Sequence, residues 1–130
     1  MTGSFSGVEI VKNGKDVDLQ IYQGANIDFT ILFKTGSSTG AAIDLTGKKA
    51  RAQFRKSLRG TVVTSFESTA SSITIDSTAG SLRFTKSSTA TAALETITEG
   101  VWDCELVTIS TGFVAKVLSG GFRVIPEVTI

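Results

Sequence analysis

The feature that most constrains the fold of this sequence is a set of short segments in which apolar and polar residues alternate. The clearest is segment 27–33, where every second residue is large and apolar. Successive side chains of a β-strand point to opposite faces, so this pattern is typical of a strand with one face on a core and the other in water. The residues expected to face the core are Ile27, Phe29, Ile31 and Phe33.

Two further segments, 49–55 and 101–106, alternate in the same way, and Gly-, Ser- and Thr-rich turns separate the segments at intervals of about 8–12 residues. Segment 88–94 alone has a helix-like composition, which Ser87 or Ser88 would cap. We therefore predict an all-β protein, an antiparallel Ig-like β-sandwich of about seven to nine short strands with one short helical turn near 88–94. Its further inward residues are expected to be Ala50, Ala52, Phe54, Trp102, Cys104 and Leu106.

The length of 130 residues fits one domain with its own core. We assign residues 17–130 to a single β-sandwich domain and residues 1–16 to an N-terminal arm. That arm is either flexible or ordered against a neighbouring subunit, because termini are usually loose unless something holds them. No signal peptide and no apolar run of membrane-spanning length is apparent, so we expect synthesis in a cytoplasm.

The residues needed for catalysis are scarce. The chain has no histidine and one cysteine, Cys104, which excludes the commonest general base, an intrachain disulfide and a zinc cluster of cysteines. No Gly-x-Ser-x-Gly motif is present. The spaced carboxylates Asp16 with Asp18 and Asp103 with Glu105 are interpreted as surface charge. We predict that the protein is not an enzyme and has no cofactor, catalytic residue or metal site.

Six of the thirteen Lys and Arg residues fall within twelve positions: Lys48, Lys49, Arg51, Arg55, Lys56 and Arg59. They form either a face that follows nucleic-acid phosphates or a solvated strand face that pairs with acids. Asp103 and Glu105 have the spacing to lie opposite Arg51 and Arg55 across a strand ladder. No aromatic residue interleaves with the cluster for base stacking, and the net charge is only +1. We favour the paired face and expect no nucleic-acid partner.

Several segments, taken in order over residues 18–129, resemble a small β domain that recurs in structural proteins of tailed bacteriophages. The resemblance implies a domain like the N-terminal modules of upper baseplate and tail-fibre proteins, and the family has no catalytic residues. The segments that carry it are Leu19-Gln20-Ile21-Tyr22-Gln23-Gly24-Ala25, Ile43-Asp44-Leu45-Thr46-Gly47, Ala50-Arg51-Ala52-Gln53-Phe54-Arg55, Ile73-Thr74-Ile75, Thr89 to Leu94, Gly100-Val101-Trp102-Asp103-Cys104-Glu105-Leu106 and Gly120-Gly121-Phe122-Arg123-Val124-Ile125-Pro126-Glu127-Val128-Thr129.

The function expected from this resemblance is that of a virion structural protein of a phage tail, baseplate or fibre-attachment region. It would be made in the host bacterial cytoplasm and assemble with other virion proteins, as a homo-oligomer or in multiple copies in the particle, without a membrane. One alternative is a capsid decoration protein. Another is a carbohydrate-binding adhesin, for which Tyr22 and Trp102 are the stacking candidates, although Trp102 is better placed in the core. The candidate assembly contacts are Val124, Ile125, Val128, Ile130, Arg51 and Arg55.

Overall fold

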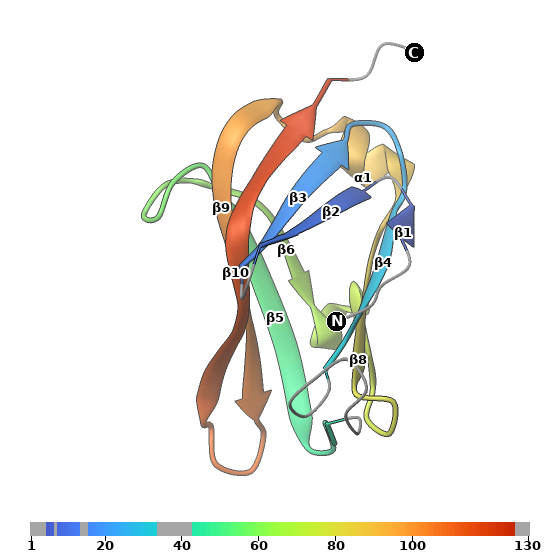
Figure 1. The fold of residues 1–130 in the computed structure, drawn as a ribbon, viewed down its shortest axis with the longest axis vertical. Coiled ribbons are helices and arrows are strands. Elements are labelled where there is room, and N and C mark those ends of the chain that lie inside the picture. Colours follow the sequence, from blue (N-terminus) through green and yellow to red (C-terminus); the bar gives the residue numbers. More distant parts are fainter. Residues whose placement is uncertain (1–4, 7, 14–15, 34–42, 127–130) are drawn as a thin grey trace.

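The computed structural model describes residues 5–6, 8–13, 16–33 and 43–126, which form two stacked β-sheets (Figure 1). The four-stranded sheet has the order β1-β4-β8-β7 and the six-stranded sheet the order β2-β3-β10-β9-β5-β6. The strands are β1 (Phe5–Ser6), β2 (Val8–Asn13), β3 (Asp16–Tyr22), β4 (Ile27–Leu32), β5 (Lys48–Arg55), β6 (Val62–Glu67), β7 (Ile73–Asp76), β8 (Ser81–Lys86), β9 (Ile97–Thr108) and β10 (Val114–Ile125).

The strand order confirms the predicted Ig-like sandwich. Strands β1, β4, β8 and β7 stand in the A-B-E-D order of an immunoglobulin sandwich, and β10, β9 and β5 stand in its G-F-C order. The helical turn is also confirmed, since α1 (Ser88–Ala92) begins where the Ser87 side chain accepts a hydrogen bond of 3.2 Å from the Ala90 N–H. A 3₁₀ turn, η1 (Ser68–Ala70), joins β6 to β7.

Two details of the predicted topology need correction. The sandwich is not wholly antiparallel, because β3 pairs with β10 in parallel, with Leu19 opposite Phe122 and Ile21 opposite Val124. These two strands are far apart in the sequence, so no hairpin forces them to run in opposite directions. Strands β9 and β10 are also longer than the short strands expected, with twelve residues each.

Part of the segment assigned to an N-terminal arm belongs to the sheets. Strand β1 pairs with β4, and β2 pairs with β3 in the register Val8 to Ile21 through Asn13 to Asp16. Backbone groups of residues 5–6 and 8–13 therefore find partners within this chain, which corrects the expectation that these residues lie outside the sandwich.

The core lies between the sheets and contains the residues that the alternating pattern assigned to it, with Phe33 partly buried against its margin. Six aromatic rings form one connected cluster across the two layers. Phe54 stacks on Trp102 at 5.1 Å between ring centroids, and Phe66 meets Phe84 of the opposite sheet edge-on at 5.6 Å. Phe84 stacks in turn on Phe29 at 4.7 Å. Such contacts add to the hydrophobic stabilisation that burying each ring provides.

A buried hydrogen bond holds β3 against the rest of the six-stranded sheet. The indole N–H of Trp102 on β9 donates to the carbonyl oxygen of Val17 on β3 at 2.8 Å. Gly120 of β10 passes so close to this carbonyl that an added Cβ atom would lie 2.1 Å from it. Glycine at 120 thus permits the close approach of β10 to β3. Strand β10 ends at Ile125, because the following Pro126 has no N–H to donate to a ladder.

Candidate functional site

The outer face of the six-stranded sheet carries the charges that the sequence singled out. Arg51 lies opposite Glu105 across β5 and β9, and its Nε is 2.9 Å from a Glu105 carboxylate oxygen. The second expected pair does not form, because Arg55 lies opposite Val101. Arg55 instead donates to the Gly60 carbonyl oxygen at 2.9 Å. The position opposite Asp103 is occupied by a glutamine, Gln53, and Asp103 pairs with Lys116 of β10 at 3.3 Å.

Other members of the basic cluster are also bound locally. The Nζ atom of Lys48 donates to the Thr108 hydroxyl at 2.5 Å, and that of Lys56 lies 2.8 Å from a Glu95 carboxylate oxygen. Among the described residues, Arg51 and Lys56 are therefore paired with carboxylates, whereas Lys48 and Arg55 donate to neutral oxygens that do not compensate their charge.

The terminal candidates are distributed between the core and the end of β10. The Val124 side chain is buried in the core of this domain, so it has no free surface to offer a partner. Ile125 is half-buried, lies opposite Tyr22 and accepts a backbone hydrogen bond of 3.0 Å from Gln23 N–H. Val128 and Ile130 lie outside the described residues.

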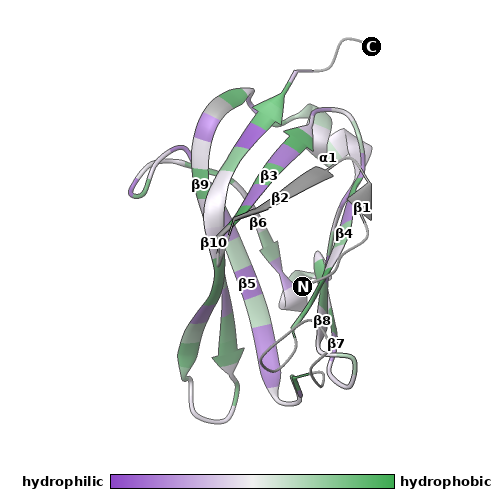
Figure 2. Cartoon of the chain, viewed as in Figure 1, coloured by the Kyte–Doolittle hydropathy of each residue, from purple (hydrophilic) through white to green (hydrophobic). Residues whose placement is uncertain are grey.

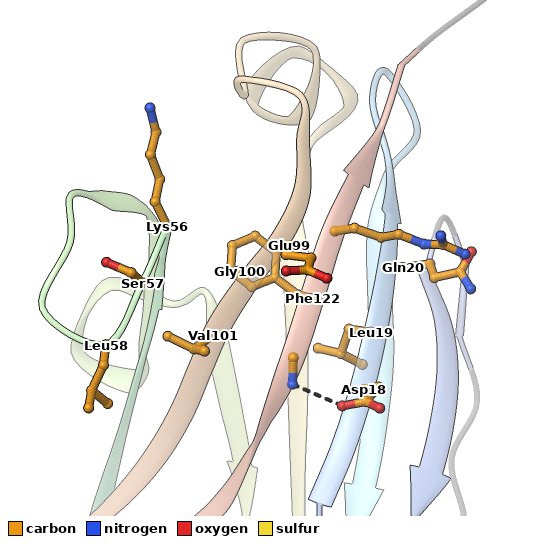
Figure 3. Close-up of a pocket in the computed structure, with 12 residues that line it drawn as sticks. Asp18, Leu19, Gln20, Lys56, Ser57, Leu58, Glu99, Gly100, Val101 and Phe122 are labelled. Carbon is orange, nitrogen blue, oxygen red and sulfur yellow. Dashed lines mark hydrogen bonds between the residues drawn. The ribbon is translucent and has the colours of Figure 1, made fainter.

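A hollow of about 660 Å³ opens on the same outer face, where β3, β10, β9 and the β5–β6 loop meet (Figure 3). Two glycines shape it. Gly121 places no side chain on the face, and at Gly100 an added Cβ atom would lie 2.4 Å from the Phe122 ring. The floor is therefore backbone together with the edge of Phe122. We call this feature the sheet hollow, and its lining residues are Asp18, Leu19, Gln20, Lys56, Ser57, Leu58, Glu99, Gly100, Val101, Gly121, Phe122 and Arg123.

The β5–β6 loop brings Leu58 and Lys56 to one side of the sheet hollow, and β3 brings Asp18 and Gln20 to the other (Figure 3). Leu58, within the β5–β6 loop, is 81% exposed, and the neighbouring Val101 is 37% exposed. Asp18 fixes the opposite wall by accepting a hydrogen bond of 2.9 Å from Gly121 N–H. Glu99 and Arg123 are exposed beside it. Such a surface suits an apolar group with a charged margin.

The second unusual surface is the turn that joins β9 to β10, which projects beyond the sandwich (Figure 1). We call residues 109–114 the hairpin tip. Ile109 and Phe113 are 64% and 67% exposed, and Val114 is 45% exposed. No charged residue occurs from 106 to 115, and the lower ends of both strands are coloured as hydrophobic in Figure 2.

The hairpin tip is ordered by its own hydrogen bonds. Thr108 N–H donates to the Phe113 carbonyl oxygen at 2.8 Å, and Gly112 N–H donates to the Thr108 carbonyl oxygen at 2.7 Å. Gly112 has a φ of 72°, which glycine adopts without strain. Ile109 N–H further donates to the Gly47 carbonyl oxygen at 3.0 Å. The exposed apolar side chains are thus presented by a defined backbone.

The candidates for chemistry are buried or engaged elsewhere. Burial raises the pKa of the Cys104 thiol to about 12, with smaller contributions from Asp103 and Glu105, so the thiolate that would react is suppressed. Trp102 is buried and its N–H is bound, which removes it as a sugar-stacking platform. Within the described ranges, no group of three or more His, Cys, Asp or Glu side chains is placed to hold a metal ion.

Among the residues that the structure describes, no helix has the length and apolar character needed to cross a membrane. No protein-family model matches the chain, and no curated protein matches it. The sheet hollow and the hairpin tip were both missed by sequence reasoning. In retrospect, the sequence carries two signals for them: the glycines Gly100 and Gly121 next to alternating segments, and the run without charged residues over 106–115.

Proposed function

We propose that this protein is a non-enzymatic structural module that works by assembling with other proteins. The observation that carries the proposal is the hairpin tip, where Ile109, Phe113 and Val114 are exposed together on an ordered turn. Clustered apolar side chains on a surface mark interaction sites more often than isolated ones do. Aromatic anchors held by a rigid backbone lose little conformational entropy on binding, which favours association.

We further propose that the assembly is a bacteriophage virion, with the module in the tail, baseplate or fibre-attachment region. The support is the ordered resemblance of segments over residues 18–129 to small β domains of tailed-phage structural proteins. On this proposal the chain is made in the host bacterial cytoplasm and ends in the particle in several copies. A capsid decoration protein also acts by assembling with other virion proteins, and it differs in its position in the particle.

The test is to locate the chain in an electron-microscopy map of the whole particle. Copies at a fixed place in the tail, baseplate or fibre attachment agree with the proposal, whereas copies on the capsid shell assign the decoration role. Absence from purified particles contradicts a virion function.

A variant at the hairpin tip tests how the module assembles. Phe113→Ser should reduce incorporation into particles several-fold, because it removes the largest side chain of the hairpin tip. The control is Val62→Thr, which removes a partly exposed apolar residue from the edge strand β6. Truncation after Arg123 is a poorer test, because it also deletes Val124 from the core. Normal incorporation of Phe113→Ser would contradict assembly through the tip.

A further inference from the structure

We infer that the hairpin tip of one copy docks into the sheet hollow of a second copy, so that the chains associate head to tail. This inference rests on the proposed function, because it names the partner of the assembly surface described above. Both surfaces belong to the same pair of long strands, with the hollow at one end of β9 and β10 and the tip at the other (Figure 1).

The two surfaces match in polarity. The tip exposes three apolar side chains, those of Ile109, Phe113 and Val114. The hollow has an apolar edge formed by Leu58 and Val101, and its floor is backbone and the edge of the Phe122 ring. Apolar groups on both sides leave water when they meet, at a gain of about 25 cal/mol per Å² buried. Gly100 and Gly121 line the hollow without adding side chains to it.

The charges around the two surfaces are also complementary. Lys48 and Lys49 lie at the base of the tip, opposite Thr108 and Val107 in the ladder. The rim of the hollow carries the carboxylates of Asp18 and Glu99. Two cations are also present there. The Lys56 ammonium group is paired with Glu95. Arg123 is therefore the one rim cation that forms no ion pair among the described residues. Opposite charges at the margin of an apolar contact favour one docking orientation over others.

The hairpin tip cannot reach the sheet hollow of its own chain. Val101 lies on β9 and Ile109 directly follows its end, eight residues further along, a separation of about 26 Å at about 3.3 Å per residue. The tip must therefore dock on another copy. Because the tip and the hollow are different patches, the contact is heterologous and generates a ring or a filament. A tip of three apolar side chains buries far less than the roughly 800 Å² per partner of a stable interface, so isolated chains should associate weakly.

The experiment is sedimentation of the whole chain over a concentration series up to about 1 mM, where a weak contact is populated. Two variants remove one partner surface each. Phe113→Ser changes the tip, and Leu58→Arg removes the apolar edge of the hollow while adding a charge that repels Lys48 and Lys49. Both positions are highly exposed, so neither change should unfold the domain, and Val62→Thr is the control.

The wild-type chain and the control should form species larger than a dimer as concentration rises, whereas each variant alone should stay monomeric. A mixture of the two variants keeps one intact tip and one intact hollow, so it should form a dimer and nothing larger. A wild-type chain that stays monomeric overturns the inference, and so does a mixture that does not dimerise or binding by the tip to lipid vesicles alone. If a monomeric wild type still requires Phe113 for incorporation into particles, the inference fails and the proposed function stands.

Discussion

Two neighbouring glycines of β10 should respond in opposite ways to the same substitution. An added Cβ atom at Gly120 would lie 2.1 Å from the Val17 carbonyl oxygen and 2.7 Å from its carbon. At Gly121 the nearest atoms, Asp18 Oδ1 and the Gly100 oxygen, are 3.5 Å away. Carbon–oxygen contacts are normally about 3.3 Å or longer, so Gly120→Ala requires β3 and β10 to separate by about 1.2 Å, whereas Gly121→Ala requires no movement.

The cost of Gly120→Ala follows from what holds Val17 in place. Overpacking a well-filled site costs about 1–3 kcal/mol. If β3 moves, the Val17 carbonyl also loses the Trp102 N–H, and an unpaired buried acceptor costs about 1–3 kcal/mol. We expect Gly120→Ala to lower the free energy of unfolding by about 3–5 kcal/mol, a large part of the roughly 5–15 kcal/mol available to a domain. Gly121→Ala should stay within about 1 kcal/mol of wild type.

Urea unfolding followed by circular dichroism measures both effects. With a slope of about 2 kcal/mol per M, Gly120→Ala should move the midpoint down by roughly 1.5–2.5 M, and Gly121→Ala by less than about 0.5 M. Trp102 is the single tryptophan, so its fluorescence reports locally on the lost bond. Equal midpoints for the two alanine variants would refute the reasoning. Both variants add the same methyl group to neighbouring residues of β10, and they differ in the distance of that group from Val17.

Three further outcomes are expected. The pKa of Cys104 is about 12, against 9.0 for a free thiol, so the unfolded chain loses this proton first as the pH rises. The free energy of unfolding should therefore fall above pH 9 by up to about 1.4 kcal/mol per pH unit, and Cys104→Ala should remove that slope in pH-dependent urea titrations. A double-mutant cycle of Arg51→Ala and Glu105→Ala should give a coupling free energy of about 0.2–1 kcal/mol that shrinks in high salt, because the pair is partly exposed; a salt-independent coupling would contradict this. Phe113→Ser should change the free energy of unfolding, measured by urea unfolding, by no more than about 0.5 kcal/mol, because the Phe113 side chain is mainly exposed. A larger loss would mean that Phe113 supports the fold.

The alternating segments could be predicted from the sequence because the two-residue alternation of side chains in a strand depends only on neighbouring residues. Ile27, Phe29 and Ile31 are buried as expected, and so are the inward residues of β5 and β9. The pairing of Arg51 with Glu105 followed from the same alternation. The second pair failed because ladder register depends on where two strands meet. Arg55 lies opposite Val101 instead of a carboxylate.

Features that depend on distant strands were not readable. The parallel pairing of β3 with β10 joins the two ends of the described chain, and no local pattern encodes it. That pairing buries Val124, which its apolar character alone had suggested as an assembly contact. The sheet hollow likewise forms where residues of β3, β9, β10 and the β5–β6 loop come together. Neither Gly100 nor Gly121 marks a surface feature by itself.

The position of β10 also affects how the protein can be made. This strand is the last of the described strands in sequence, yet it lies inside the six-stranded sheet between β3 and β9. During synthesis, β3 therefore has no partner on its β10 side until residues 114–125 have left the ribosome. Contacts of such long sequence separation close slowly, which leaves strand edges unpaired in the nascent chain. We expect the nascent protein to depend on chaperones or on low temperature until β10 is in place.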